Sequence, residues 1–196
     1  MRLARRTALG VLGAALMPVH AQARNLTIAA ASDLRFALDE AMRAFRAVHA
    51  DARIEVVYGS SGKLATQIRH GAPFDVFLSA DREFADALHR DGFAAGAPRL
   101  YARGHLVAWS TDASLGRLPL ADLVRDARVQ RFAIANPEHA PYGRRAVEAL
   151  RSQGQWDAVQ PKLVLGENIA QTVQFVQTGA AQAGLAAQKT SPSALL

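Results

Sequence analysis

Cysteine is absent from this 196-residue chain, and aromatic residues make up only 7% of it. Without cysteine the protein has no disulfide bonds, no thiolate zinc sites and no thiol catalysis. Long hydrophobic runs are missing too: the apolar stretch from Thr7 to Met17 is far short of the roughly 20 residues that a membrane-spanning helix needs. We therefore expect no helical membrane anchor and a fold that depends on its apolar core.

The N-terminus has the sequence features of a secretory signal peptide. Arg2, Arg5 and Arg6 form a basic start, the apolar stretch follows, and Ala21-Gln22-Ala23 supplies the small residues of a cleavage site. This order predicts a signal peptide over residues 1–23, cleaved after about Ala23, and an exported mature protein.

The net charge of +6 includes the predicted signal peptide, so the charge of the mature chain is the one that bears on its partners. Residues 1–23 carry three arginines and no acidic residue, which leaves +3 for the remainder. No basic run or interleaved aromatic platform is present, so no nucleic-acid partner is expected. The six histidines lack the spacing of metal ligands, so we expect surface or capping roles for them and no bound metal cation.

Short apolar runs typical of buried strands alternate with segments that repeat apolar residues at helical spacing. The predicted strands are Leu26–Ala31, Arg53–Tyr58, Asp75–Leu78, His105–Ser110, Arg131–Ala135, Lys162–Leu165 and Ala183–Ala187. The predicted helices are Asp33–Val48, Lys63–His70, Arg82–Arg90, Leu120–Arg125, Gly143–Gln153 and Ala170–Thr178. This order predicts an α/β fold with mostly parallel sheets flanked by helices, and a boundary between lobes around Tyr101 to His105.

The stretch YGSSGKLA, residues 58–65, resembles a nucleotide-binding loop only at first sight. A Walker loop needs a glycine where Val57 stands and a hydroxyl where Leu64 stands, so that interpretation fails. What remains is a glycine-serine turn between a strand and a helix, where free amides and the helix dipole favour an anion. The alternative is that Ser60 or Ser61 simply caps the helix.

The same arrangement recurs at three more predicted strand ends. Ser32 and Asp33 begin the helix after the first strand, where the Ser32 hydroxyl and the Asp33 amide are available as donors. Two more helix starts, at residues 135–143 and 166–169, follow strands in the second half of the chain. Helix starts that face one another across a cleft would surround an oxyanion with uncharged donors.

Four segments together resemble the periplasmic molybdate-binding proteins of ABC transporters, which are type II periplasmic binding proteins. The resemblance extends from about Arg24 to Ala187, and no single segment is specific by itself. The segments are AAASDL (29–34), YGSSGKLATQI (58–68), GAPFDVFLSAD (71–81) and NPEHAPYGRRAVEAL (136–150).

The resemblance implies a monomeric, two-lobed periplasmic protein that is not an enzyme and needs no cofactor. It would capture molybdate, and usually tungstate, and deliver the anion to a membrane permease. The implied division is lobe 1 at 24–104, lobe 2 at 105–190 and a tail at 191–196. Ser32 and Ser61 would donate hydroxyl and amide hydrogen bonds, and Tyr142 and Ile169 would donate amides. The predicted ligand-binding set is Ser32, Asp33, Ser60, Ser61, Tyr142 and Ile169, and it holds molybdenum as an oxyanion, not as a cation.

The sequence departs from this family at two places. Many members have a tyrosine hydroxyl donor where this chain has Ala187. The chain ends at Leu196, whereas family members continue for several tens of residues that complete the first lobe, so the resemblance implies that the C-terminal part of lobe 1 is missing. A sheet without that part would expose an edge and apolar faces.

Two alternatives stay open, and one basic residue needs a role. Another oxyanion, such as sulfate, would suit the same donors. Pocket size decides between sulfate and molybdate, and the sequence does not report it. A secreted serine hydrolase could use Ser60 or Ser61, but GSSG is not the G-x-S-x-G motif and the sequence marks out no histidine and acid pair. Lys63 is expected to be a solvated side chain that makes no contact with the ligand.

Overall fold

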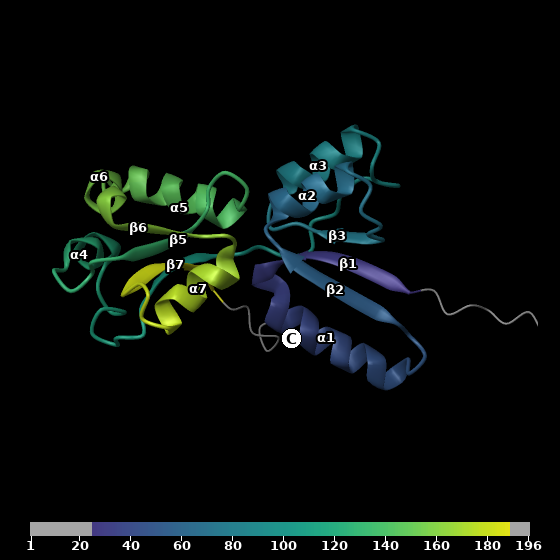
Figure 1. Ribbon diagram of the computed structural model, residues 1–196, viewed down its shortest axis with the longest axis horizontal. Coiled ribbons are helices and arrows are strands. Elements are labelled where there is room, and N and C mark those ends of the chain that lie inside the picture. The colour runs from purple at the N-terminus through teal and green to yellow at the C-terminus, as the bar shows by residue number, and fades with distance from the viewer. Residues whose placement is uncertain (1–24, 189–196) are drawn as a thin grey trace, which may run out of the picture.

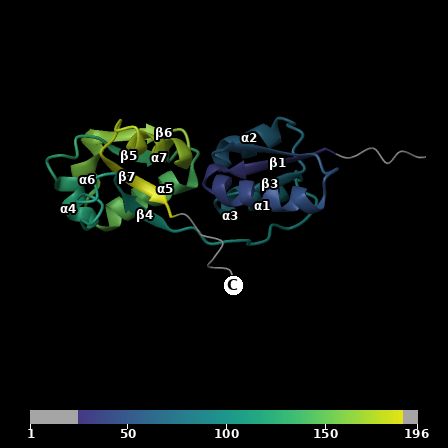
Figure 2. The same ribbon diagram turned by 90° about the horizontal axis from the view of Figure 1, so that it is seen from below.

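The chain forms two sheets that lie side by side in separate lobes. The computed structural model describes residues 25–188, so the predicted signal peptide at 1–23 and the tail at 191–196 lie outside the described residues. Figure 1 and Figure 2 show the two lobes joined by the segment between α3 and β4, the one crossing in the described part of the chain. The boundary at 104/105 falls in that segment and stays a prediction.

The first lobe holds a three-stranded parallel sheet of order β2-β1-β3. Its strands are β1 (Leu26–Ala31), β2 (Ile54–Gly59) and β3 (Val76–Leu78). A short 3-10 turn, η1 (Ser32–Leu34), leads into α1 (Arg35–Val48), which lies on one side of the sheet. The helices α2 (Ser61–Arg69) and α3 (Arg82–Arg90) lie on the other side (Figure 1).

The second lobe holds a four-stranded sheet of order β4-β7-β5-β6. Two pairings are parallel and the pairing of β4 with β7 is antiparallel, so the predicted mostly parallel α/β fold is confirmed. The strands are β4 (Leu106–Trp109), β5 (Phe132–Ala135), β6 (Leu163–Gly166) and β7 (Ala183–Ala187). The helices are α4 (Leu120–Arg125), α5 (Pro141–Ser152), α6 (Trp156–Val159) and α7 (Ile169–Gln177), with a 3-10 turn, η2 (Gln160–Lys162), after α6.

The two lobes are unequal in apolar core. Each buried core cluster of the described residues lies in the second lobe, where Phe132 and Leu150 are fully buried between the sheet and α5. The first lobe buries fewer large side chains: Ile28, Leu64 and Leu88, beside four alanines at positions 29, 30, 31 and 65. No residue of α1 is buried, and Phe36 and Val48 are exposed, because a three-stranded sheet is too small to cover the apolar stripe of a 14-residue helix.

Within the described residues no helix is both long enough and apolar enough to cross a membrane. The buried interior of each lobe comes from sheet faces and the helices packed on them. This layered arrangement brings the carboxyl ends of β1, β2, β5 and β6 toward the line where the lobes meet (Figure 1).

Candidate functional site

Four helix starts follow four strand ends at the junction of the lobes. In the first lobe β1 leads into η1 and β2 leads into α2; in the second lobe β5 leads to α5 and β6 leads to α7. Between them lies a small cavity of about 190 Å³, part of which is open to solvent. Residues of both lobes line it: Ala31, Asp33, Gly59, Ser60, Ser61, Ala80, Ala140, Pro141, Tyr142 and Ile169.

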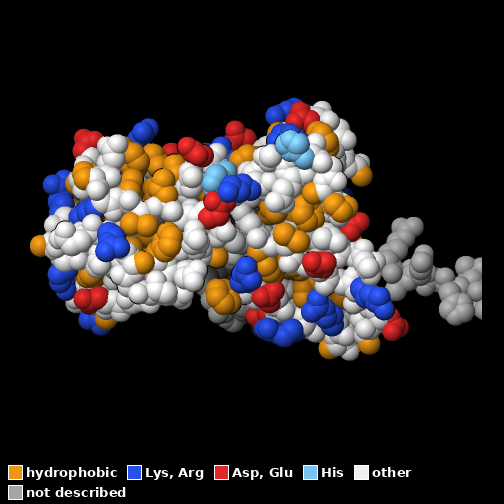
Figure 3. Space-filling model, in the orientation of Figure 1, with side chains coloured by type: hydrophobic (Ala, Val, Ile, Leu, Met, Phe, Trp, Pro, Cys, Tyr) orange, Lys and Arg blue, Asp and Glu red, His pale blue; other side chains and the backbone are white. Residues whose placement is uncertain are grey.

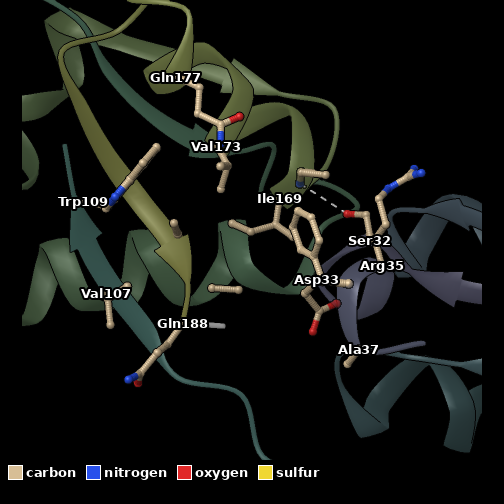
Figure 4. Close-up of a pocket in the computed structure, with 14 residues that line it drawn as sticks. Ser32, Asp33, Arg35, Ala37, Val107, Trp109, Ile169, Val173, Gln177 and Gln188 are labelled. Atoms are coloured by element: carbon tan, nitrogen blue, oxygen red, sulfur yellow. Dashed lines mark hydrogen bonds between the residues drawn. The ribbon is translucent and has the colours of Figure 1, made fainter. Parts of the chain in front are cut away.

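The structure brings five of the six predicted site residues to this cavity. Asp33, Ser60 and Ser61 line it from the first lobe, and Tyr142 and Ile169 line it from the second. Ser32 lines an adjacent, larger cavity instead, and its hydroxyl crosses to α7. Ser32 Oγ donates to Asn168 Oδ1 at 3.2 Å and accepts from Ala170 N at 3.4 Å, the contact that Figure 4 draws as a dashed line. In this geometry the Ser32 hydroxyl joins the first lobe to the second by hydrogen bonds.

Free backbone amides point to an anion site. Ser61 and Ile169 are the first residues of α2 and α7, and Tyr142 is the first residue of α5 with an amide hydrogen because Pro141 precedes it. Amides in the first turn have no partner within their own helix. In residues 25–188 none of these three amides has a hydrogen-bond acceptor. Their dipoles make this end of each helix favourable for negative charge.

The two serines of the glycine-serine turn are held by partners outside α2. Ser61 is fully buried, and its Oγ accepts from Ala80 N at 2.9 Å, which leaves its hydroxyl hydrogen free to donate. Ser60 Oγ lies 2.9 Å from His139 Nδ1, across the junction. Ser60 occupies the N-cap position of α2, and its carbonyl accepts from Leu64 N, but neither serine side chain makes a capping bond to the helix.

Asp33 is the one carboxyl among the residues that line the small cavity. Its Oδ2 accepts from the Tyr142 hydroxyl at 3.3 Å, and its buried Oδ1 has no hydrogen-bond partner among the described residues. Burial raises the pKa of this carboxyl, against the opposing effects of its backbone hydrogen bond and of Tyr142. Burial and the nearby Asp33 also raise the pKa of the Tyr142 hydroxyl, so it stays a neutral donor. Desolvation thus acts against the charged form of Asp33, while its hydrogen bonds support that form.

Ion pairs join the lobes on both flanks of the cavity. Lys63 pairs with Glu167, and His139 Nε2 lies 3.8 Å from another oxygen of that carboxylate. Arg144 contacts Asp81 and Glu83 on the other flank. In Figure 3 basic, acidic and histidine side chains gather where the lobes meet. Lys63 is 53% exposed, as expected for a solvated side chain, and its ion pair across the junction was not foreseen.

Some of these contacts could not be found from the sequence pattern. His139 was expected at the surface, yet it is half-buried against Ser60. Ala80 reaches the cavity from the segment between β3 and Asp81, the residue that caps α3. In the described residues no group of three or more histidine, cysteine, aspartate or glutamate side chains is arranged to hold a metal ion.

A larger apolar cavity lies beside the small one, between η1, α1 and the second sheet (Figure 4). It measures about 1120 Å³ including space open to solvent, and Trp109, Val107 and Val173 line its second-lobe side. Ala187 lines this cavity as well, at the position where the family resemblance led us to expect a tyrosine hydroxyl. Asp33 lies between the two cavities, since it lines both.

Comparison with known proteins places this geometry in context. Residues 26–194 match the family model of bacterial extracellular solute-binding proteins. The molybdate-binding protein ModA of Azotobacter vinelandii is 37% identical over 177 residues, which cover 90% of this chain and 69% of that protein. The molybdate-binding protein ModA of Rhodobacter capsulatus is 39% identical over 135 residues, which cover 68% of this chain and 53% of that protein. The chain thus spans between about half and about two thirds of these relatives.

A solved structure matches as well. The periplasmic molybdate-binding protein of Azotobacter vinelandii superposes with a TM-score of 0.75 at 29% identity, covering 83% of this chain and 71% of that one. Both lobes are therefore arranged as in a periplasmic binding protein.

Proposed function

This chain belongs to the bacterial extracellular solute-binding proteins, among the periplasmic molybdate-binding members, and on that premise we propose that it binds molybdate at the small cavity. The observation that carries the proposal is the set of free amides of Ser61, Tyr142 and Ile169, which come from both lobes and line one cavity. We extend the proposal to tungstate, which shares the tetrahedral shape and double charge, and to delivery of the anion to the permease of an ABC transporter in the periplasm.

Uncharged donors suffice for a dianion in this setting. Hydrogen bonds to a charged group contribute about 1.5 to 3 kcal/mol each, so three amides and the Ser61 hydroxyl offset the cost of ordering the lobes. No lysine or arginine lines the small cavity, which agrees with Lys63 being engaged by Glu167. An anion that bonds to both lobes at once favours the closed arrangement over an open one.

Sulfate is the alternative ligand, because the same donors would bind any tetrahedral dianion. The size of the cavity decides between the two anions, and a closed lobe arrangement that fits the larger molybdate would leave sulfate loosely held. Phosphate differs chemically, since its proton needs an acceptor.

The hydrolase alternative gains one observation from the structure. The sequence marked out no histidine and acid pair, but Ser60, His139 and Glu167 follow one another across the junction. The geometry is poor for catalysis: the serine meets Nδ1, Glu167 lies 3.8 Å from Nε2, and Lys63 neutralises that carboxylate. A general base oriented by a third group needs hydrogen-bond distances at both nitrogens. We therefore favour binding over turnover.

Titration calorimetry of the purified protein with molybdate, tungstate, sulfate and phosphate tests this proposal. Molybdate and tungstate should bind and the other two should not; equal affinity for sulfate would contradict the choice of ligand. Fluorescence of Trp109, near the lobe junction, gives a second signal. Hydrolysis of a small ester that is lost in Ser60→Ala would favour the enzyme instead.

Replacement of Ser61 by alanine tests the placement of the donor. Ser61→Ala removes a hydroxyl that can donate to the anion, so molybdate affinity should fall by roughly 1 to 3 kcal/mol. Ser152→Ala is the matched control, since Ser152 is exposed at the far end of α5 and bonds only to Ala149 O. An unchanged affinity in Ser61→Ala would place the anion elsewhere.

A further inference from the structure

Arg144 forms the most extensive side-chain contact between the lobes. It lies in the first turn of α5, in the second lobe, and its guanidinium reaches α3 of the first lobe. Nη2 lies 2.6 Å from Asp81 Oδ2 and Nη1 lies 2.7 Å from Glu83 Oε2. The guanidinium carbon also sits 4.9 Å from the ring centre of Phe84. One planar group therefore bonds two carboxylates and covers an aromatic face.

This contact is better held than the other ion pair between the lobes. The side chains of Arg144 and Asp81 are 32% and 13% exposed, whereas those of Lys63 and Glu167 are 53% and 43% exposed. Water and salt screen exposed pairs strongly, and such pairs contribute little. Asp81 is also fixed in place, because its Oδ1 accepts from Phe84 N and caps α3. Little conformational freedom remains to be lost when Arg144 binds it.

The same helical turn carries an anion donor. Tyr142 and Pro141 precede Arg144 in α5 and line the small cavity, while Ala80 precedes Asp81 and lines it from the opposite lobe. When Arg144 binds Asp81, the start of α5 is held against the segment after β3. The Tyr142 amide is then fixed opposite the α2 donors.

We propose that Arg144 is a positioning residue that holds the lobes closed over the bound oxyanion, an inference that rests on the proposed anion site. In an open arrangement the arginine and its two carboxylates are separated and hydrated; in the closed arrangement they are paired. The difference favours closure and slows release of the anion. Arg144 does not touch the anion, so its effect reaches the ligand only through lobe position.

The salt dependence of anion affinity distinguishes this role from a purely local packing role. The donors at the cavity are uncharged, so added salt acts on closure mainly through the ion pairs between the lobes. Anion affinity in the unchanged protein should therefore fall with ionic strength more steeply than in a variant without Arg144. A residue with only a local packing role would not alter that slope.

The test compares two neighbouring arginines. Arg144→Met keeps the aliphatic stem but removes the charge, and Arg145→Met is the matched control because Arg145 pairs with Glu148 within α5 and is 63% exposed. Molybdate dissociation is followed by stopped-flow tryptophan fluorescence, and affinity by calorimetry at low and high sodium chloride. We expect roughly tenfold weaker binding in Arg144→Met, about 1.4 kcal/mol, mostly as faster dissociation and with a flatter salt dependence. Arg145→Met should stay within about twofold of the unchanged protein.

A double-mutant cycle with Asp81→Asn separates the contact from general effects, since asparagine keeps the oxygen that accepts from Phe84 N and removes the charge that Arg144 contacts. The losses of Arg144→Met and Asp81→Asn should be non-additive. Equal affinities in the two arginine variants, or additive losses with an unchanged dissociation rate, would overturn the proposal.

Failure of the proposed function is a separate outcome. If the unchanged protein binds none of the four anions, closure is measured without ligand, by small-angle scattering at low salt. A larger radius of gyration in Arg144→Met than in Arg145→Met would then support the lobe-holding role, and identical radii would overturn it.

Discussion

Gly62 makes the one backbone hydrogen bond between the lobes among residues 25–188, and a methyl group there should prevent full closure. Its amide donates to His139 O at 2.9 Å, from the first turn of α2 to the segment before α5. A Cβ at this position would lie 2.7 Å from His139 O and 3.0 Å from both Cα and Cβ of His139. Two of these atoms are backbone, so rotation of a flexible side chain cannot relieve the contact.

The expected magnitude follows from what the methyl group displaces. Separation of the lobes by a few tenths of an ångström weakens the bond between Gly62 and His139, which is worth about 0.5 to 1.5 kcal/mol. The donors on the two sides of the cavity move apart by the same amount, and at least one hydrogen bond to the anion lengthens. Together these give about 1 to 3 kcal/mol, or roughly 5- to 150-fold weaker anion binding.

Folding stability should change in the opposite direction. Gly62 lies in a helix, and alanine is favoured over glycine in helices by up to about 1 kcal/mol. Gly62→Ala should therefore keep or raise the melting temperature of the ligand-free protein while it weakens anion binding. A simple folding defect would lower both quantities.

Calorimetric titration with molybdate and a thermal melt without anion measure the two effects. Gly96→Ala is the control, because a Cβ there meets nothing within 4 Å. Unchanged affinity in Gly62→Ala would refute the closed arrangement as the binding state. A parallel loss of affinity and melting temperature would refute the steric explanation.

Two further predictions concern stability. Burial raises the pKa of Asp33 above 3.8, so the folded protein holds this proton more tightly than the unfolded chain, and stability is lost as pH rises from 3.8 through the folded-state value. Asp33→Asn removes that loss, so denaturant titration should show a larger gain over the unchanged protein at neutral pH than in acid; an equal difference would contradict the raised pKa. Phe132 is fully buried in the second-lobe core, so Phe132→Ala should lower the free energy of unfolding by about 3 to 5 kcal/mol, and a loss below about 1 kcal/mol would show that the site can collapse.

Local patterns were enough to place most helices and strands. Four elements have the bounds predicted from their apolar spacing, and the other predicted elements shift by one or two residues at their ends. The four are Leu26–Ala31, Arg82–Arg90, Leu120–Arg125 and Ala183–Ala187. Helix α6 was missed because Trp156–Val159 is about one turn long, too short to show a periodic pattern. The antiparallel pairing of β4 with β7 was also missed, since an apolar run does not record the direction of its neighbour.

The site was only partly predictable, because helix starts depend on local sequence whereas contacts between the lobes do not. Helix starts depend on local sequence, so the segments around the cavity could be placed in advance. Tyr142 and Ile169 were named as donors within them only from the resemblance to the family, and their role as ligands stays a prediction. The partner of a side chain between lobes depends on how the lobes meet. Ser60 and His139 are 79 positions apart, and Arg144 and Asp81 are 63 apart. No spacing rule connects such pairs.

Because the two lobes have unequal apolar cores, contacts between them should also stabilise the lobe with the smaller core. The first lobe buries few large side chains, whereas the second has a core that includes Phe132 and Leu150. A smaller buried apolar surface gives less hydrophobic stabilisation, so we expect the first lobe to open or unfold more readily. The proposed anion donors on α2 and the carboxylates at the start of α3 belong to this weaker lobe. An anion that bridges the cavity, together with Arg144, therefore ties the weaker lobe to the stronger one, and binding free energy adds directly to its stability.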